Sequence, residues 1–288
     1  MSETIPVSIR ARALAKTAAK RAIDLGFAAR VAALRAIGVV DFPVPPNTSL
    51  RVTSSTSVRH YYESGLTTLL PIITVAMREG VDFDRPVRIL DFGCGVGRQL
   101  LHLDRLFPAA EIHGCDVNHR SVAYVAKTFP RVKAVVNSFD PPLPYADGTF
   151  DLIYSVSTFS HFAEADARLW LAELKRVARP GGLLCLTFNG ITSLQRAHEK
   201  GMRQEYSGDR LMAEGRWFDA DAEAFAAIKS AEAASEFGSS LIGVPRLYWE
   251  MHYAPAVFAG LAEAEGFSVV ATLAGIIDRY QDLLVLKA

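Results

Sequence analysis

The sequence predicts an α/β fold in which a doubly wound, seven-stranded sheet carries helices on both faces. An apolar strand runs directly into three glycines at alternate positions, in the segment Val87-Arg-Ile-Leu-Asp-Phe-Gly-Cys-Gly-Val-Gly-Arg98. Downstream, apolar strands alternate with helical sequence, which is typical of a parallel sheet covered on both faces. Near the end, two apolar strands are joined by only eight residues. That is too few for a helical crossover, so these strands should form an antiparallel hairpin.

The strands and helices are expected in a regular order along the chain. Five strands precede the hairpin, at Arg88–Phe92, Glu111–Val117, Lys133–Asn137, Phe150–Tyr154 and Leu183–Phe188. The two hairpin strands are expected at Phe267–Leu273 and Asp282–Lys287. A helix interrupted by Pro71 is expected from Ser57 to Glu79, and another from Ala165 to Ala178. The sequence Arg179-Pro-Gly-Gly182 should form a turn before the fifth strand, because proline and glycine favour turns.

Composition fits a single cytoplasmic enzyme. Half of the 288 residues are hydrophobic, which is enough for a large core. The 31 basic and 31 acidic residues balance, so no overall charge attracts the chain to nucleic acid. The 3 cysteines have unrelated spacings, which indicates buried thiols rather than a disulfide framework or a zinc site. No apolar run is long enough to span a bilayer, and the N-terminus lacks the apolar core of a signal peptide.

The first 47 residues are interpreted as a basic helical extension and a linker, followed by one domain over residues 48–288. Between Ser8 and Ile37 the chain carries seven basic residues and one acidic residue. This segment is either an extension or homodimer arm with a solvated basic face, or a surface that meets an anionic membrane or acceptor. The proline-rich stretch from Asp41 to Asn47 then marks the linker.

A helix-prone insertion over residues 190–248 follows the predicted fifth strand. Open α/β sheets bind ligands at the carboxyl ends of their strands. A long excursion from that edge is therefore most simply a substrate lid. The alternative is an extension that serves packing or oligomerisation.

An acid, Asp116, follows the glycine turn at the separation of about 20 residues that is usual for a carboxylate binding ribose hydroxyls. With the glycine turn, the Phe150-Asp-Leu-Ile153 strand and the Arg179-Pro-Gly-Gly182 turn, it completes an ordered set of four motifs. This set resembles the class I S-adenosylmethionine (SAM) dependent methyltransferases, and the resemblance covers roughly Leu50 to the C-terminus. It implies a Rossmann-like fold with SAM as the cofactor.

The last strand carries a finer resemblance. The sequence Gln281-Asp-Leu-Leu-Val-Leu286 is similar to the Gln-Asp-Leu-x-Val-Leu ending of a bacterial subgroup often associated with glycan pathways. This implies methyl transfer to a hydroxyl of a sugar, a glycan or another small bacterial metabolite. Two alternatives stay open: a SAM-binding subunit without catalysis, and an NAD-linked oxidoreductase, for which the Gly-x-Gly-x-x-Gly spacing is missing. Tyr154 and Ser155 stand where metal-dependent O-methyltransferases usually place paired acids, which argues against a catalytic metal.

The cofactor contacts are those that the resemblance implies. The backbone of the glycine turn should lie against the methionine portion of SAM, Asp91 should hold its amino group, and Asp116 should accept from both ribose hydroxyls. Residues after the second and third strands would border the adenine, Ser155 would pass beneath the sulfonium, and the helix before the first strand would supply an aromatic wall. The expected cofactor-binding residues are Tyr62, Asp91, Gly93, Cys94, Gly95, Gly97, Asp116, Val117, Asn118, Ser138, Phe139 and Ser155.

Two histidines compete for the role of general base. His161 follows the fourth strand in a segment that resembles Ser-Val-Phe-Thr-His-Leu of the family, and an imidazole that titrates near neutrality can accept a hydroxyl proton. His161 could instead cap a helix or orient the cofactor. His252 lies at the end of the insertion, where relatives often carry a histidine. Asp282 would orient His252 or bind an acceptor hydroxyl, and strand-end capping is the alternative for this acid.

Overall fold

The computed structural model describes residues 25–46, 57–199, 208–219 and 250–288. The chain divides into two compact units, Met1–Tyr61 and Tyr62–Ala288. In the first unit a helix spans residues 25–36. The expected boundary between residues 47 and 48 lies outside the described residues, and so does the part of the basic extension that precedes residue 25.

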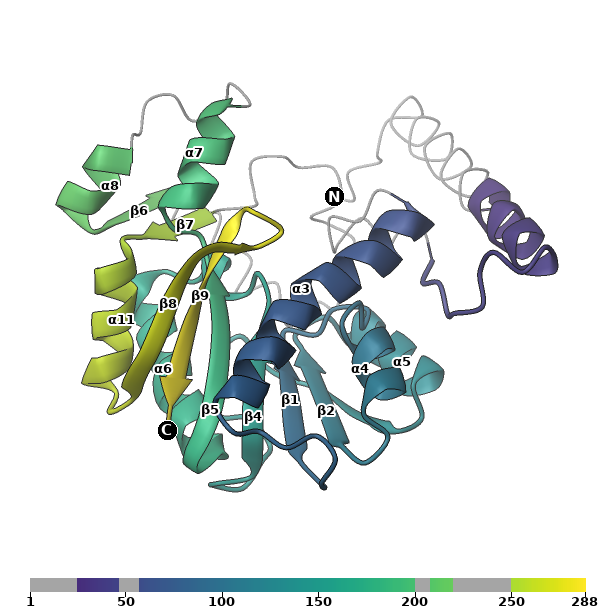
Figure 1. Cartoon of the computed structure of the whole chain (residues 1–288), viewed down its shortest axis with the longest axis horizontal. Coiled ribbons are helices and arrows are strands. Elements are labelled where there is room, and N and C mark those ends of the chain that lie inside the picture. The colour runs from purple at the N-terminus through teal and green to yellow at the C-terminus, as the bar shows by residue number, and fades with distance from the viewer. Residues whose placement is uncertain (1–24, 47–56, 200–207, 220–249) are drawn as a thin grey trace, which may run out of the picture. The chain divides into compact units, whose positions relative to one another are not determined.

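A seven-stranded sheet forms the centre of the second unit, in the order β3-β2-β1-β4-β5-β9-β8 (Figure 1). The chain winds outward from β1 through β2 to β3 and then returns to β4 and β5, all in parallel. β9 pairs antiparallel with both β5 and β8. The predicted doubly wound sheet and its terminal hairpin are therefore confirmed. The strands are β1 Arg88–Phe92, β2 Glu111–Asp116, β3 Val132–Val136, β4 Phe150–Ser155, β5 Ala178–Phe188, β8 Ser268–Ile277 and β9 Gln281–Lys287.

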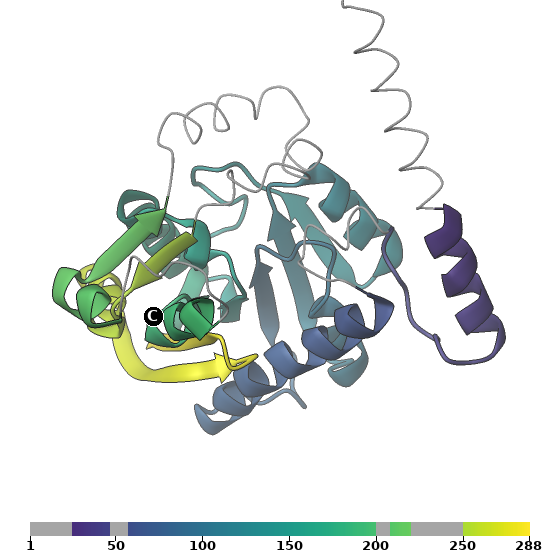
Figure 2. The same cartoon turned by 90° about the horizontal axis from the view of Figure 1, so that it is seen from above.

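Helices flank the sheet, and Figures 1 and 2 place α3 and α6 on opposite faces of it. A short 3-10 helix, η1, spans Phe159–His161 between β4 and α6. Among the helices that the structure describes, none is long and apolar enough to cross a bilayer. The helices around the sheet are α3 Val58–Arg78, α4 Leu100–Leu106, α5 His119–Thr128, α6 Glu164–Val177 and α11 Pro255–Ala264.

The expected interruption at Pro71 is wrong, because α3 continues through this residue to Arg78. Proline removes one backbone hydrogen bond from a helix interior. On the buried face of α3, Leu69, Ile72 and Ile73 are all 5% exposed or less. Burying such side chains contributes roughly 1.5 to 3 kcal/mol each, enough to offset the lost bond.

The expected turn at Arg179-Pro-Gly-Gly182 is an irregularity inside β5. Phe150 of β4 pairs with Ala178, and Leu152 pairs with Leu183, so the proline–glycine segment is looped out of the ladder. The terminal hairpin is also tighter than the sequence predicts. β8 extends to Ile277, and a three-residue turn with positive φ at Asp278 and Arg279 leads into β9.

The insertion contains helices, as expected, and a strand pair that the sequence does not reveal. Its described elements are α7 Ile191–Glu199, α8 Gly208–Glu214 and β6 Arg216–Asp219. β6 pairs antiparallel with β7 Glu250–Tyr253 in a separate two-stranded sheet. Residues 200–207 and 220–249 of this region lie outside the described residues.

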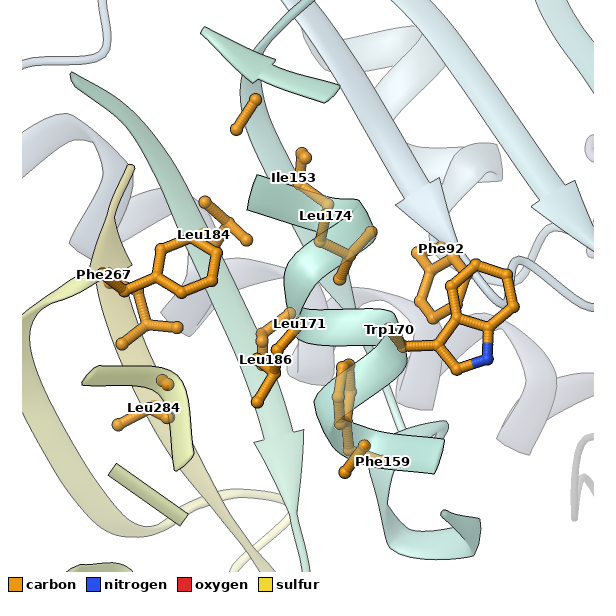
Figure 3. Close-up of a cluster of buried hydrophobic side chains, with 14 of the residues drawn as sticks. Phe92, Ile153, Phe159, Trp170, Leu171, Leu174, Leu184, Leu186, Phe267 and Leu284 are labelled. Atoms are coloured by element: carbon orange, nitrogen blue, oxygen red, sulfur yellow. The ribbon is translucent and has the colours of Figure 1, made fainter. Parts of the chain in front are cut away.

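A continuous apolar core joins α6 to the strands beside it (Figure 3). The indole of Trp170 packs against Phe92 at 4.8 Å between ring centroids. Its Nε1 donates a hydrogen bond of 3.1 Å to the carbonyl of Phe139. The core therefore supports the carboxyl end of β1 and also holds the loop that follows β3. Its labelled members in Figure 3 are Phe92, Ile153, Phe159, Trp170, Leu171, Leu174, Leu184, Leu186, Phe267 and Leu284.

The helix α3 approaches the turn after β1 very closely at Gly65. A Cβ atom at Gly65 would lie 2.3 Å from the carbonyl oxygen of Arg98. Two side-chain hydrogen bonds fasten the same contact, from Arg98 Nη1 to Ser64 Oγ at 3.2 Å and from Gln99 Nε2 to Thr68 Oγ1 at 2.8 Å. Glycine at position 65 is thus a requirement of this packing.

Replacing Gly65 tests the close packing of α3 against the Arg98 backbone. Gly65→Ala should lower the free energy of unfolding by roughly 1 to 3 kcal/mol, because the Arg98 backbone must move. Gly260→Ala in α11 is the matched control, since a Cβ there meets nothing within 4 Å; it should raise the same quantity by roughly 0.5 to 1 kcal/mol. Chemical denaturation of the full chain measures both. Equal stability of the two variants would contradict the described contact.

Candidate functional site

The turn after β1 is held to the end of β2 by backbone hydrogen bonds. The N–H groups of Gly93 and Cys94 both donate to the carbonyl of Cys115, each at 2.9 Å. The N–H of Gly95 donates to Oδ2 of Asp116 at 2.8 Å. These bonds give the turn a fixed shape, because its first three N–H groups already have partners inside the protein.

Glycine is required in this turn by its conformation and by its neighbours. Gly93, Gly95 and Gly97 have φ values of 83°, 53° and 74°, a region that residues with a Cβ rarely adopt. A Cβ at Gly93 would lie 2.1 Å from Oγ1 of Thr158, and one at Gly97 would lie 2.8 Å from the ring of Phe129. Part of the glycine pattern is thus explained by packing within the protein.

Asp91 is a buried acid in the middle of the sheet, 1% exposed. Burial raises its pKa to about 7, and the nearby charge of Asp116 adds to this, whereas the neighbouring Tyr154 hydroxyl and Arg98 lower the pKa. Oδ2 of Asp91 and the hydroxyl of Tyr154 nevertheless both lack a well-formed hydrogen bond within the described part of the chain. A buried carboxylate oxygen without a partner is costly, so it marks a position where a ligand donor fits.

The acid and the turn fit the amino-acid end of SAM. A primary ammonium supplies N–H donors and a positive charge, which are what Oδ2 of Asp91 lacks. The adjoining turn is free of side chains at Gly93 and Gly95. The residues present therefore match the group that the resemblance implies for this place.

Asp116 is oriented by two backbone donors. Oδ2 accepts from Gly95, and Oδ1 accepts from the N–H of Asn118 at 2.7 Å. Each carboxylate oxygen has a second lone pair, so both can still accept a ribose hydroxyl. Burial raises the pKa of Asp116, and these two backbone bonds oppose the shift. Val117, beside it, is partly exposed.

Asn118 acts as the N-cap of α5. Its side-chain oxygen accepts from the N–H groups of Arg120 and Ser121 at 3.0 and 3.2 Å. Such a cap stabilises a helix by about 1 kcal/mol. The side chain is thus engaged in the fold, and the expected contact of Asn118 with adenine stays a prediction.

Beyond β3, the structure brings Asn137 toward Asp116, whose carbonyl accepts from the Asn137 N–H at 3.2 Å. The Asn137 amide donates through Nδ2 to the carbonyl of Ser138, while its Oδ1 is buried without a hydrogen bond from any described residue. An amide acceptor at this place suits the exocyclic amine of adenine. Ser138 is exposed and Phe139 is partly buried. Asn137, which the sequence places beside these two residues after the third strand, is therefore a further candidate for the contact with adenine.

After β4, the chain folds back onto the turn. The Ser155 hydroxyl donates to the carbonyl of Phe92 at 2.9 Å, and Thr158 Oγ1 donates to the same oxygen at 3.2 Å. Ser155 is fully buried. Its side chain therefore joins β4 to β1. The expected position of Ser155 beneath the sulfonium stays a prediction, supported by its closeness to the glycine turn.

Tyr62 lies on α3 and packs on His102 of α4. The two rings meet edge to face with 4.7 Å between centroids, and Nε2 of His102 lies 2.8 Å from the Tyr62 carbonyl. Burial lowers the pKa of His102, which favours the neutral ring. The role of Tyr62 as a wall of the cofactor site stays a prediction.

His161 ends η1, directly after the segment that folds onto the turn. The backbone N–H of His161 donates to the carbonyl of Thr158 at 3.0 Å, and the residue is partly exposed. The strand β7, which pairs with β6 of the insertion, contacts this segment, because the Tyr253 hydroxyl donates to the carbonyl of Phe162 at 3.1 Å. Arg216 of β6 also forms an ion pair of 2.8 Å with Glu164 at the start of α6.

His252 and Asp282 are engaged in two separate contacts. His252 is fully buried, with its Nδ1 3.1 Å from the Ser193 hydroxyl. The Asp282 carboxylate accepts from the N–H of Gly275 at 2.8 Å and from the Thr192 side chain. Burial raises the pKa of Asp282, and these bonds lower it. The contacts favour the strand-end role for Asp282 and leave His161 as the more accessible imidazole.

The described residues hold no group of three His, Cys, Asp or Glu side chains arranged to bind a metal ion. The thiols Cys94, Cys115 and Cys185 are buried and free. Burial raises the pKa of each thiol. These cysteines are therefore protonated members of the core.

Residues 89–182 match the family model described as a methyltransferase domain. This segment contains the glycine turn, Asp116 and the strand that leads to Ser155. The matched segment covers less than half of the chain. Together with the described fold, it points to a SAM-dependent methyltransferase domain. S-adenosylmethionine is the cofactor that the fold and this match support.

The similar curated proteins are named as methyltransferases. A malonyl-[acyl-carrier protein] O-methyltransferase of Geobacter sulfurreducens is 34% identical over 123 residues, covering 41% of this chain and 43% of that protein. The methyltransferase GfsG of Streptomyces halstedii is 30% identical over 160 residues, covering 51% and 56%. The chain thus spans about half the length of the curated relatives it matches.

Solved structures share the fold at low sequence identity. Magnesium protoporphyrin IX methyltransferase of Synechocystis, with bound S-adenosylhomocysteine (SAH), has a TM-score of 0.51 at 15% identity, covering 80% of this chain and 86% of that one. The 1,6-didemethyltoxoflavin-N1-methyltransferase of Burkholderia thailandensis has a TM-score of 0.50 at 13% identity, covering 86% and 92%. One of these enzymes is named for a nitrogen acceptor, so the fold leaves the acceptor atom open.

Replacing Asp91 separates its effects on stability and on binding. The pKa rises from 3.8 to about 7 in the folded state, so between these pH values the folded protein holds more protons than the unfolded chain. The stability of the folded protein therefore falls as the pH rises through this range, and the full cost of the buried acid is present above about pH 7. Asp91→Asn without ligand should therefore raise the melting temperature, more at about pH 8 than at about pH 5. The same variant should bind SAH at least about tenfold more weakly, because the ammonium loses a charged acceptor.

Thermal unfolding at the two pH values and calorimetry with SAH measure these effects. Asp151→Asn, on the same sheet at a half-exposed position paired with Arg179, is a matched control that should leave SAH affinity unchanged. A uniform loss of melting temperature in Asp91→Asn would contradict the assigned cost of ionisation.

Proposed function

We propose that this protein is a SAM-dependent O-methyltransferase that acts on a hydroxyl of a sugar, a glycan or another small metabolite. The observation that carries the proposal is the buried carboxylate of Asp91, whose Oδ2 lacks a well-formed hydrogen bond from the described residues, beside a glycine turn that is bonded to Asp116. A turn of fixed shape between two acids suits a ligand with an ammonium at one end and a ribose at the other. The resemblance of Gln281–Leu286 to the ending of that bacterial subgroup is the support for the glycan assignment.

The residues of this chain then have distinct tasks. Asp91 holds the amino group, Asp116 accepts from the ribose hydroxyls, and Asn137 accepts from the adenine amine. Bound SAM supplies a methyl group that is already activated on a sulfonium. The protein contributes position, and it needs a base only if the acceptor carries a proton that must leave. His161 is the residue we assign to that task.

A carboxyl acceptor is the second candidate, and the relatives named malonyl-[acyl-carrier protein] O-methyltransferase favour it. A carboxylate is ionised at neutral pH and needs no base. The family-model match ends at residue 182, before the insertion that would cover the acceptor. The two acceptor classes therefore differ in one measurable respect, the dependence of transfer on His161.

Three further assignments remain proposals. The insertion over residues 190–248 serves as a wall or lid for the acceptor, supported by the ion pair of Arg216 with Glu164 and by its pairing with β7, whose Tyr253 contacts Phe162. The basic N-terminal extension is a homodimer arm or an anionic membrane contact.

A cytoplasmic location agrees with the composition. A SAM-binding subunit without catalysis is the competing interpretation of the same cofactor residues.

Cofactor choice is tested by calorimetry on the full chain. SAM and SAH should bind, whereas NAD should not, and Asp116→Ala should weaken SAM binding by roughly 2 to 3 kcal/mol, because charge-assisted hydrogen bonds are lost. Asp104→Ala on α4, a partly buried ion-pair partner of Arg131, is the control and should leave SAM binding unchanged. Tight NAD binding without a response to SAM would overturn the proposal.

Incubation with methyl-labelled SAM tests the acceptor class. The acceptor pool should contain nucleotide sugars, glycan fragments, small phenols and acyl thioesters of malonate, with mass detection of each product. We expect a methyl ether on a hydroxyl. A methyl ester on malonate would establish the second candidate, and no labelled product would favour the subunit without catalysis.

Replacing His161 and replacing His252 should have different effects in the same methyl-transfer assay. His161→Ala is expected to lower kcat by about 10² or more with little change in SAM affinity, because the proton acceptor is lost. His252→Ala should mainly lower the melting temperature, since a fully buried side chain bonded to Ser193 is removed. Near-normal turnover of His161→Ala along the acidic limb of the pH profile would show that no base is required at this position.

A further inference from the structure

Ser157, between β4 and η1, has a backbone conformation that serine rarely adopts. Its φ is 63°, in the left-handed region, where a Cβ crowds the backbone. The other non-glycine residues with positive φ in the described chain are Asp278 and Arg279, in the tight turn between β8 and β9. A strained conformation away from such a turn persists only where its surroundings fix it.

Three side chains fix Ser157, one at each of its polar groups. The N–H donates to Thr187 Oγ1 at 2.7 Å, and the hydroxyl donates to Gln281 Oε1 at 2.9 Å. The carbonyl accepts from the Ser160 hydroxyl at 2.8 Å. The left-handed conformation is therefore held from β5, from β9 and from η1 together.

Gln281 is the centre of this network. Its Oε1 accepts from Thr187 at 3.0 Å as well as from Ser157, and its Nε2 donates to Oδ1 of Asn189 at 3.0 Å. The residue is 6% exposed. Its amide orientation is defined, because the oxygen faces two hydroxyl donors and the nitrogen faces a carbonyl-type acceptor.

The conformation of Ser157 decides where Thr158 lies. Thr158 Oγ1 donates to the carbonyl of Phe92, and it occupies the space that a Cβ at Gly93 would need. The threonine thus rests on the first glycine of the turn assigned to SAM. If Ser157 relaxed to an ordinary φ, the chain direction after it would change and Thr158 would leave the turn.

We propose that Gln281 is a positioning residue for the cofactor site. It acts through Ser157, whose hydroxyl it binds, and it thereby keeps Thr158 seated against Gly93. The inference rests on the proposed function, because the turn is the one assigned to SAM. It also gives the first residue of the Gln-Asp-Leu-x-Val-Leu ending a physical task within the fold.

The test uses the contrast between alanine and glycine at position 157. Both replacements remove the hydroxyl, but only glycine adopts the left-handed region without strain. Calorimetry with SAH on the full chain should give at least about tenfold weaker binding for Ser157→Ala and for Gln281→Leu. The double variant Ser157→Gly/Gln281→Leu should regain most of that loss, and Ser157→Gly should bind about tenfold more tightly than Ser157→Ala.

Gln195→Leu on α7 is the matched control, since Gln195 is exposed; it should leave SAH affinity unchanged. Melting temperatures identify any variant that fails to fold, and the alanine–glycine contrast at position 157 then carries the test alone. Equal affinity of Gln281→Leu and the wild type would overturn the proposal, and so would a double variant as weak as Gln281→Leu. A wild-type protein that does not bind SAH would refute the proposed function instead.

Discussion

The end of β2 holds the turn after β1, and the rest of the site depends on this attachment. Cys115 accepts two backbone N–H groups from the turn, and Asp116 accepts a third from Gly95. The turn therefore has its shape before any ligand arrives, so binding does not have to order it. The same bond fixes the carboxylate that we assign to the ribose. The glycine turn after β1 and Asp116 at the end of β2 are thus held together as one rigid part of the fold.

Other elements reach the site by resting on this unit. α3 packs onto the far end of the turn at Gly65, while Thr158 packs onto its beginning at Gly93. Gln281, from the last strand, supports the Thr158 side through Ser157. The described part of the insertion contacts the start of α6, just after η1, through the ion pair of Arg216 with Glu164. Under the proposed roles, a change at Gln281 or Ser157 would alter the turn assigned to SAM through backbone geometry, without contact with the cofactor.

The sequence predicts those parts of the site that are local in the chain. The glycine turn and Asp116 are readable because each follows its own strand, and their spacing reports a βαβ unit. The bond between Ser157 and Gln281 joins positions 124 residues apart, and no periodicity or motif indicates it. The Pro71 prediction failed because packing of a helix face outweighs one lost hydrogen bond. The tie of Asp282 to Gly275 likewise depends on an irregularity in β8 that the sequence leaves open.

A crystal structure of the full chain with SAH tests the central claim most directly. The account predicts that the SAH amino group lies within hydrogen-bond distance of Oδ2 of Asp91, and that both ribose hydroxyls contact Asp116. Thr158 should remain seated on Gly93 with Ser157 in the left-handed conformation. SAH bound elsewhere, or bound at this edge with Asp91 still lacking a partner, would contradict the account.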